Sequence, residues 1–334
     1  MQPFSYMRPA TAQEAVNAFT TLGANARYIA GGTTLYDLMK LDIETPAHLV
    51  DVTSVEGLDQ IETDGETLRF GSRALMAEVA AHEIISRDYP VLSEALSKAA
   101  SQQLRNMATV GGNLLQRTRC MYFRNGADGV YPCNKRAPGS GCAAIGGLDR
   151  GQAVLGASDA CTAVSPGDWP VALTAMDASI EVLGPAGGRS IPIGDLYLLP
   201  GETPHKEFAL LPGEMITAIS VPMGTGARGS TYHKIRDRWS YAFALASAAV
   251  ALEMEGDTVA RARIALGGVA TRPWRAHAAE QGLAGRRLTS ETALETGRTA
   301  FREARAGHHN AYKIDLGART VADALLIAAE RSRS

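Results

Sequence analysis

The sequence is almost free of cysteine, and the little it has is concentrated in one stretch. The four cysteines are Cys120, Cys133, Cys142 and Cys161, with the spacing C-x12-C-x8-C-x18-C. The tight C-x2-4-C pair of most structural zinc sites is missing. Thiolates suit either a tetrahedral zinc ion or an iron–sulfur cluster in which each iron takes one cysteine, and the wide spacing favours the cluster. The structural alternatives are two disulfides or four unrelated buried thiols.

A surplus of charge and a long apolar run are also absent. Lys and Arg number 33 against 35 for Asp and Glu, so the net charge is only -2 and indicates neither nucleic acid nor an anionic membrane as a partner. No apolar stretch approaches the roughly 18 residues of a membrane span, and residues 1–15 lack the basic and apolar regions of a signal peptide. We expect a cytoplasmic protein, or a periplasmic one if a partner subunit carries the export signal.

The sequence offers no pattern typical of a catalytic base or nucleophile. Its seven histidines include the pair His308 and His309, and none of them stands in an HExxH motif or a triad-like setting. We therefore predict no catalytic residue in this chain.

Short helices and strands alternate along the first hundred residues. Thr11 and Glu14 have the form of a capping box, which predicts a helix with an apolar face that ends at Gly23. A strand at 28–30, a glycine-rich turn and a helix at 35–40 follow. Further strands are expected at 48–52, 60–62, 67–71, 180–183 and 214–222, and further helices at 75–81, 91–99 and 170–178. The cysteine stretch has no sustained apolar periodicity and is predicted to be a long loop.

The C-terminal third begins after residues 224–229, which are typical of a linker. Segments 231–235, 243–253 and 259–269 are long enough to pair as an antiparallel sheet. Helices are expected at 290–305 and 318–330. The length and the 46% hydrophobic content fit two or three domains of α+β class.

Two glycine-rich turns, at 30–35 and 108–114, have the composition of phosphate-binding loops. Glycines let the backbone approach an anion closely, successive N–H groups form a nest, and threonine hydroxyls add donors. These properties fit the pyrophosphate of a dinucleotide. Neither turn matches G-x-G-x-x-G, and the P-loop motif is absent, so neither standard nucleotide motif applies. The alternative is a pair of ordinary tight turns.

Together, the segments Tyr28–Leu35 and Gln103–Asn113 resemble the paired signature of FAD-binding medium subunits in the xanthine dehydrogenase and carbon monoxide dehydrogenase family. The resemblance continues through Leu211–Glu214 and Tyr232–Lys234. It implies a two-lobed FAD-binding domain of the vanillyl-alcohol-oxidase/PCMH-like type, with lobes at 1–56 and 57–223. A C-terminal α+β domain of antiparallel sheet plus helices would occupy 224–334.

The resemblance also gives the cysteine stretch a meaning. Most such subunits run directly from the second glycine turn to an acidic residue near the flavin, whereas here an insertion at 117–165 precedes Asp168. The arrangement is similar to medium subunits of bacterial molybdenum aldehyde oxidoreductases and of 4-hydroxybenzoyl-CoA reductase, whose inserted loop carries a 4Fe-4S cluster beside the FAD. The resemblance thus implies that the four cysteines ligate such a cluster.

The FAD contacts implied by the resemblance come from both turns and from later segments. The first turn would wrap the pyrophosphate, the second would form the opposite wall, and Ala100 would line the flavin side. Asp168 would hydrogen-bond the cofactor, Ile216 would pack near the isoalloxazine and Lys234 would offer it a cation. As alternatives, Asp168 and Lys234 could be solvated charges and Ile216 ordinary core. The full set is Ile29, Ala30, Gly31, Gly32, Thr33, Thr34, Leu35, Ala100, Thr109, Gly112, Asn113, Asp168, Ile216 and Lys234.

The function implied is that of the FAD and 4Fe-4S electron-transfer subunit of a heterotrimeric molybdenum hydroxylase, an aldehyde oxidoreductase. The partners would be a large subunit with the molybdenum cofactor, a small subunit with 2Fe-2S clusters, and an external electron acceptor. One alternative is the medium subunit of a 4-hydroxybenzoyl-CoA reductase-type enzyme, with the electrons flowing the other way. Another is a non-redox protein in which the cysteines bind zinc.

Overall fold

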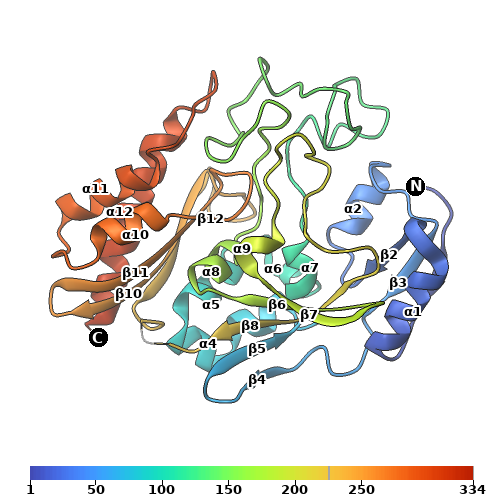
Figure 1. Ribbon diagram of the computed structural model, residues 1–334, viewed down its shortest axis with the longest axis horizontal. Coiled ribbons are helices and arrows are strands. Elements are labelled where there is room, and N and C mark those ends of the chain that lie inside the picture. The colour runs from blue at the N-terminus through green and yellow to red at the C-terminus, as the bar shows by residue number, and fades with distance from the viewer. Residues whose placement is uncertain (225, 334) are drawn as a thin grey trace.

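Three β-sheets organise the chain, which is described here from a computed structural model that covers residues 1–224 and 226–333 (Figure 1). The N-terminal sheet lies on the right of the view, the largest sheet at the bottom, and the C-terminal sheet with its helices on the left. The expected linker at 224–229 includes Thr225, which lies outside the described residues, as does Ser334.

The N-terminal unit is a small parallel sheet covered by a capped helix. Strands β1 (Ser5–Met7), β2 (Ala26–Ile29) and β3 (His48–Asp51) pair in the order β1-β3-β2, with helices α1 (Ala12–Leu22) and α2 (Leu35–Lys40) and the 3-10 turn η1 (Gly23–Asn25). Thr11 and Glu14 form the reciprocal capping box, and α1 ends at Gly23, where φ is 75°. The predicted first helix is therefore confirmed, and its buried Ala15 and Val16 face the core.

The largest sheet is antiparallel and carries most of the central helices. Its order is β4-β5-β8-β6-β7, and Phe70, Trp169 and Ile219 are completely buried in the core beneath it. The strands are β4 (Ile61–Thr63), β5 (Thr67–Gly71), β6 (Ser179–Gly184), β7 (Gly187–Pro192) and β8 (Met215–Pro222). The helices are α3 (Met76–Ala81), α4 (Glu83–Asp88), α5 (Pro90–Ser97), α6 (Gln102–Arg105), α7 (Val110–Leu114), α8 (Trp169–Ala175) and α9 (Ile193–Leu196).

The C-terminal sheet is antiparallel, in the order β12-β11-β10-β9. Its strands are β9 (Ser230–Ile235), β10 (Ala246–Glu255), β11 (Thr258–Gly267) and β12 (Trp274–Arg275), and its helices are α10 (His277–Leu283), α11 (Ser290–Ala300) and α12 (Tyr312–Ser332). Helix α12 packs on β9 and β10, while α5 and α8 of the central unit cover the sheet from the other side. Because successive strand residues point to opposite faces, Ala249 and Ala251 join the central core, whereas Ala248 and Val250 join the C-terminal core. This explains why β10 is apolar at nearly every position.

The cysteine stretch is a long loop, as predicted. Between Leu115 and Asp168 the described chain forms turns and isolated bridges but neither helix nor strand. Figure 1 shows it in green at the top, above the sheets. One bridge, Leu155 to Ala270, ties the loop to the C-terminal unit.

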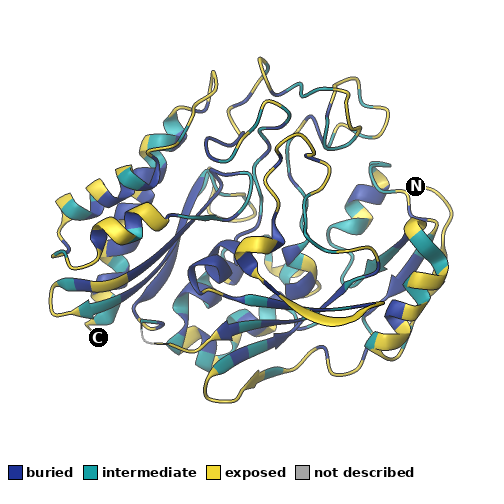
Figure 2. Ribbon diagram, viewed as in Figure 1, coloured by how far each residue is buried: buried dark blue, intermediate teal, exposed yellow. Residues whose placement is uncertain are grey.

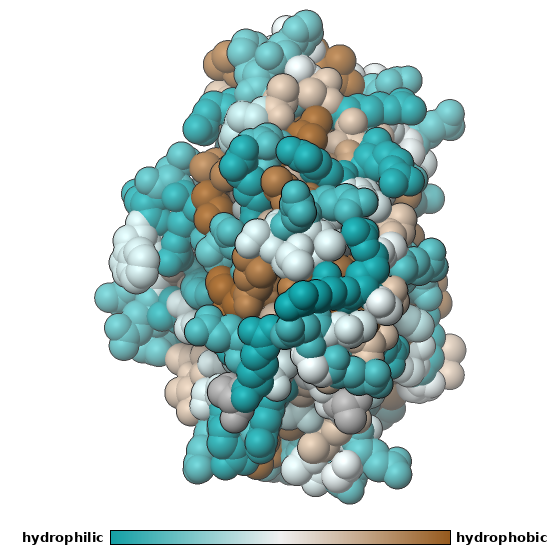
Figure 3. Space-filling model, turned by 90° about the vertical axis from the view of Figure 1, so that its left-hand side faces the viewer, coloured by the Kyte–Doolittle hydropathy of each residue, from teal (hydrophilic) through white to brown (hydrophobic). Residues whose placement is uncertain are grey.

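The distribution of buried residues shows that helices and loops cover the three sheets. Dark blue runs along the strands and the inner helix faces, and yellow along the outer faces of α1 and α11 (Figure 2). Seen from the side of the C-terminal helices, the surface is mainly hydrophilic with small separate apolar patches (Figure 3). A helix with the length and hydropathy of a membrane span does not occur in the described parts of the chain.

Candidate functional site

The two glycine-rich turns touch each other. A Cβ atom at Gly31 would lie only 1.8 Å from the carbonyl oxygen of Met107, so the backbones meet at a distance that only glycine permits. Gly111 of the second turn is also tightly packed, because a Cβ there would lie 2.6 Å from the Cβ of Ser72, which directly follows strand β5. The fold thus brings two turns that are far apart in sequence together as adjoining walls, which is the arrangement that the paired signature implies.

The first turn leaves its backbone donors unused. Throughout residues 1–224 and 226–333, no protein acceptor is hydrogen-bonded to the N–H groups of Gly31, Gly32, Thr33, Thr34 or Leu35. Gly32 has φ +70°, a left-handed conformation that turns successive N–H groups toward one side. All five residues are partly exposed. The turn therefore fits a pyrophosphate, which would accept hydrogen bonds from these groups.

The second turn holds a buried acceptor without a partner. Thr109 begins helix α7, and its Oγ1 accepts from the Gly112 N–H at 3.1 Å. Asn113 Oδ1 is buried and has no hydrogen-bond partner among the described residues. Because an unpaired buried polar atom costs about 1–3 kcal/mol, this position fits a ligand that supplies a donor, as the hydroxyls of a ribityl chain would.

Asp168 and Lys234 form a buried ion pair, so their alternative interpretation as solvated charges is wrong. Lys234 Nζ lies 2.8 Å from Asp168 Oδ2, and their side chains are only 1% and 6% exposed. The Tyr232 hydroxyl donates to Asp168 Oδ1 at 2.5 Å and also lies 2.9 Å from Ser247 Oγ. Burial raises the pKa of Tyr232 well above its usual value, so its phenol stays protonated and remains a donor.

The chain segment that leads to Ala100 contacts this ion pair. Lys234 Nζ donates to the carbonyl of Lys98 at 3.0 Å, and Arg236 donates to the same oxygen. Two residues after Lys98, Ala100 adopts a left-handed backbone conformation with φ 47°. This conformation costs about 1–3 kcal/mol for a residue that has a Cβ atom, and such strained residues are common at functional sites. Ile216 is 6% exposed on β8, where it belongs to the central core, as its structural alternative predicted. Its position near an isoalloxazine stays a prediction.

The four cysteines line a single pocket. All four are free thiols, so the disulfide alternative is not what the structure shows, and their common pocket argues against unrelated thiols. Cys133 and Cys142 face each other across an isolated β-bridge. Cys120 Sγ accepts from Gln152 Nε2 at 3.4 Å, and Cys161 Sγ from the Ala163 N–H at 3.5 Å.

The thiols share a pocket but do not form a tetrahedral set. In the part of the chain that the structure describes, no three His, Cys, Asp or Glu side chains are placed to hold one metal ion. A zinc ion needs its thiolates on one centre, whereas a cubane spreads four thiolates over four irons.

The pocket is buried, and cationic side chains lie near it. Burial raises the pKa of Cys120, and it raises the pKa of Cys161 to about 11, while the charge of Lys135 acts in the opposite direction on Cys161. Arg117 and Lys135 both pair with Glu207, at 2.6 and 3.2 Å, and these side chains are at most 17% exposed. Bound metal would be needed to deprotonate the buried thiols, and the nearby cations would stabilise the resulting negative charge.

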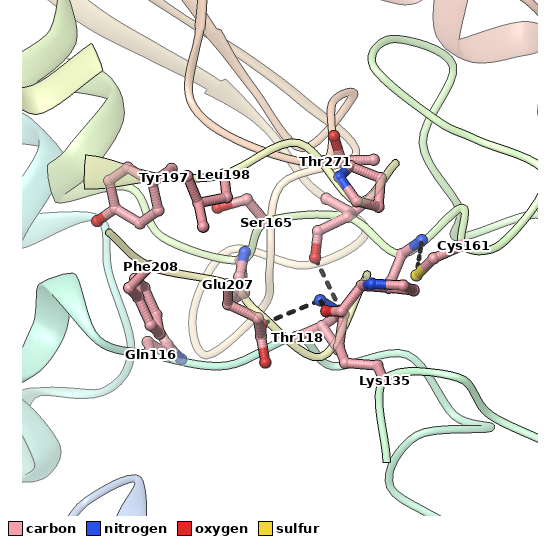
Figure 4. A pocket seen from close by; sticks show the side chains of 15 residues that line it. Gln116, Thr118, Lys135, Cys161, Ser165, Tyr197, Leu198, Glu207, Phe208 and Thr271 are labelled. Carbon is pink, nitrogen blue, oxygen red and sulfur yellow. Dashed lines mark hydrogen bonds and ion pairs between the residues drawn. The ribbon is translucent and has the colours of Figure 1, made fainter. Parts of the chain in front are cut away.

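A second pocket lies next to the cysteines (Figure 4). It shares Lys135, Cys161 and Ala163 with the cysteine pocket and reaches Gln116, just beyond helix α7. Tyr197, Glu207 and Phe208 line it from the loop that follows α9. Sequence reasoning missed these three residues, because no local motif marks them. The Tyr197 hydroxyl donates to the Leu114 carbonyl at 2.8 Å and so fastens this loop to the second turn.

The two predicted sites are close along the chain as well. Six residues separate Asn113 from Cys120, so the Cα atoms of the two can lie no more than about 25 Å apart. Along this stretch the second glycine turn is followed by Gln116, which lines the second pocket, and then by Cys120, which lines the cysteine pocket.

Comparisons with known proteins agree with this arrangement. Residues 2–224 match the model of the FAD-binding domain in molybdopterin dehydrogenase, and residues 230–328 match the C-terminal domain of the CO dehydrogenase flavoprotein. The chain is 49% identical over 328 residues to the aldehyde oxidoreductase FAD-binding subunit PaoB of Escherichia coli, covering 97% of this chain and 98% of that subunit. It is 28% identical to the carbon monoxide dehydrogenase medium chain of Afipia carboxidovorans, covering 85% and 81%.

A solved structure has the same fold along almost the whole chain. Carbon monoxide dehydrogenase from Hydrogenophaga pseudoflava, in a form that lacks the Mo-pyranopterin moiety of its cofactor, aligns with TM-score 0.77 and 26% identity over 99% of this chain and 98% of that chain. The α+β fold, with an FAD-binding domain followed by an antiparallel sheet and helices, is confirmed.

The chain belongs to the FAD-binding medium subunits of the molybdenum hydroxylase family. It is an oxidoreductase subunit, and the substrate chemistry takes place on a partner subunit.

Proposed function

We propose that this protein is the FAD and 4Fe-4S electron-transfer subunit of a heterotrimeric aldehyde oxidoreductase. The observation that carries the proposal is that all four cysteines line one pocket beside an FAD-binding fold. The 49% identity to an aldehyde oxidoreductase FAD-binding subunit supports aldehydes as the substrate class.

The residues of this chain would bind and orient the cofactors rather than transform a substrate. The N–H groups of the first turn would hold the pyrophosphate, and Asn113 would accept from the ribityl chain. The buried pair of Asp168 and Lys234 would fix the polar edge of the site, since both side chains are held by several hydrogen bonds. When bound, the flavin would accept and release electrons one or two at a time. It could therefore exchange electrons both with one-electron carriers such as iron–sulfur clusters and with two-electron acceptors.

Cys120, Cys133, Cys142 and Cys161 would each ligate one iron of the cluster. Their pocket is lined by residues of the loop itself, with Cys133 and Cys161 buried, and it adjoins the second pocket. A large molybdenum subunit and a small 2Fe-2S subunit would supply electrons, and an external acceptor would receive them.

The test is the cofactor content of the purified complex and of this chain alone. We expect released FAD at about one per chain, together with about four iron and four acid-labile sulfide, which is the composition of one cubane. FAD without iron would remove the cluster from the proposal, and zinc in place of iron would overturn it.

A 4-hydroxybenzoyl-CoA reductase-type subunit is the second candidate, because an inserted cysteine loop of this kind fits it equally. The discriminating experiment is activity of the whole complex with aldehydes and an artificial acceptor, compared with reduction of an aromatic acyl-CoA by a strong donor. Aldehyde oxidation supports the first proposal and acyl-CoA reduction the second.

A further inference from the structure

We propose that Gln152 is a positioning residue for the cysteine site: its amide donates a hydrogen bond to the Cys120 sulfur and thereby raises the reduction potential of the cluster. The inference rests on the proposed function, since it assigns a role to a residue beside the proposed cluster.

The contact between the two side chains is buried and directional. Gln152 is 4% exposed, and its Nε2 lies 3.4 Å from Cys120 Sγ, within hydrogen-bonding distance for sulfur. A thiolate can only accept, so the amide nitrogen, and not the oxygen, must face the sulfur. In the described chain, Gln152 Oε1 is buried without any partner. Among the described residues, the contact with the sulfur is thus the hydrogen bond that orients this amide.

The backbone around Gln152 is fixed by the segment that leads into helix α12. Asn310 Nδ2 donates to the carbonyls of Gln152 and Ala153, both at 3.4 Å. Lys313 is 2% exposed, and its Nζ donates to the Gly151 carbonyl at 3.3 Å and to the Gly268 carbonyl at 2.7 Å. The C-terminal unit therefore holds the main chain on which the Gln152 amide is presented to the loop.

A buried carboxylate completes this attachment. Asp149 is 6% exposed and accepts from the backbone N–H groups of His308 and His309, at 2.7 and 2.8 Å. These bonds and those of Asn310 and Lys313 join residues 149–153 to residues 307–313 across a long sequence separation. The position of the amide relative to Cys120 is thus set by tertiary contacts.

The effect of the Gln152 amide on the reduction potential follows from the change in charge at the thiolates. Reduction adds an electron to the cluster and places more negative charge on its thiolate ligands, so an N–H that points at one of these sulfurs stabilises the reduced form more than the oxidised form. Removing that donor should lower the midpoint potential.

The test is a redox titration of the purified complex, followed by the paramagnetic signal of its reduced 4Fe-4S cluster. Gln152→Leu and Gln152→Met both remove the donor at similar volume. Gln281→Leu, an exposed position on α10, is the matched control. We expect both Gln152 variants to have lower midpoint potentials, with full iron and FAD, and the control to match the unmodified protein.

Two outcomes would overturn the inference. An unchanged potential in both iron-loaded Gln152 variants would show that the hydrogen bond does not act on the cluster, while the proposed function would stand. Loss of iron from both folded variants, with the control fully loaded, would assign Gln152 to cluster retention instead of tuning. If the unmodified protein itself contained FAD but no iron, the failure would lie in the proposed function.

Discussion

Lys234 Nζ and Asp168 Oδ2 lie 2.8 Å apart in a nearly solvent-free position, although 65 residues separate them in the sequence. Lys234 comes from strand β9 of the C-terminal unit, and Asp168 directly precedes helix α8 of the central unit. The pair therefore joins two units at the place where the resemblance puts the flavin.

The pair gives the first prediction. Lys234→Met should destabilise the protein by about 3–5 kcal/mol, because it leaves the Asp168 carboxylate buried and uncompensated. FAD content should fall as well. Urea unfolding measures the stability, and flavin absorbance measures the content.

The control for this variant is an ion pair on the protein surface, where both side chains are exposed to solvent. Arg319 and Asp315 are 64% and 67% exposed, so Arg319→Ala should lower the free energy of unfolding far less than Lys234→Met does. Equal stability losses in the two variants would contradict the special role of the buried pair.

The contact between the glycine turns gives the second prediction. Gly31→Ala places a Cβ 1.8 Å from the Met107 carbonyl oxygen, so the two turns must separate. The steric cost is about 1–3 kcal/mol, and we expect the purified chain to retain little FAD. Gly194→Ala is the matched control, since a Cβ there meets no atom within 4 Å, and it should leave FAD content unchanged. Full flavin in the Gly31 variant would show that the turns need not touch to bind it.

The cysteine pocket gives the third prediction. Replacing Cys133 or Cys142 with Ser should remove most of the iron and labile sulfide, because one of the four irons then lacks its thiolate ligand and the cluster becomes unstable. The glycine turns lie outside the pocket, so FAD should remain in the folded variants. Iron analysis beside flavin absorbance measures both. Unchanged iron in both serine variants would exclude these cysteines as ligands.

Lys313 gives a prediction for the dependence of stability on pH. Burial lowers the pKa of its ammonium to about 8, from 10.5 in the unfolded chain. Between these values the unfolded state binds more protons, so stability rises with pH from about 8 to 10.5. The cost of burying the charged Lys313 ammonium is fully present below pH 8. The free energy of unfolding should rise by on the order of 3 kcal/mol between pH 8 and pH 10.5, as this cost disappears.

Lys313→Met removes this titration. The difference in unfolding free energy between the unmodified protein and the variant should therefore change across pH 8 to 10.5 and stay constant from pH 6 to 7. Other groups that titrate in that window cancel in the difference. A difference that does not vary with pH would show that the lysine is not perturbed.

Local patterns in the sequence predicted the local structures. The capping box of Thr11 and Glu14 predicted helix α1, and the lack of periodicity predicted a loop for the cysteine stretch. Both succeed because a cap or a turn depends on neighbours only a few residues away.

Elements that depend on distant partners were missed or misplaced. Strand β7 is glycine-rich and mostly exposed, and it exists because it pairs with β6. Helix α12 begins at Tyr312, before the expected start at 318, because the charged Lys313 is buried on its inner side and interrupts the apolar pattern. Strand β10 begins at Ala246, where its pairing with β9 begins, and not at 243. Helices α4, α6, α7, α9 and α10 and strands β1 and β12 were not predicted at all.

The sequence by itself determined the chemistry available to this protein: two glycine turns suited to an anion, and four thiols within one loop. Only the tertiary structure decided how these groups meet. Contacts between Gly31 and Met107, between Asp168 and Lys234, and between Cys120 and Gln152 join residues that are 32 to 76 positions apart. Such contacts depend on how sheets and helices pack, because burial and geometry are properties of the whole fold and leave no pattern in the neighbouring residues.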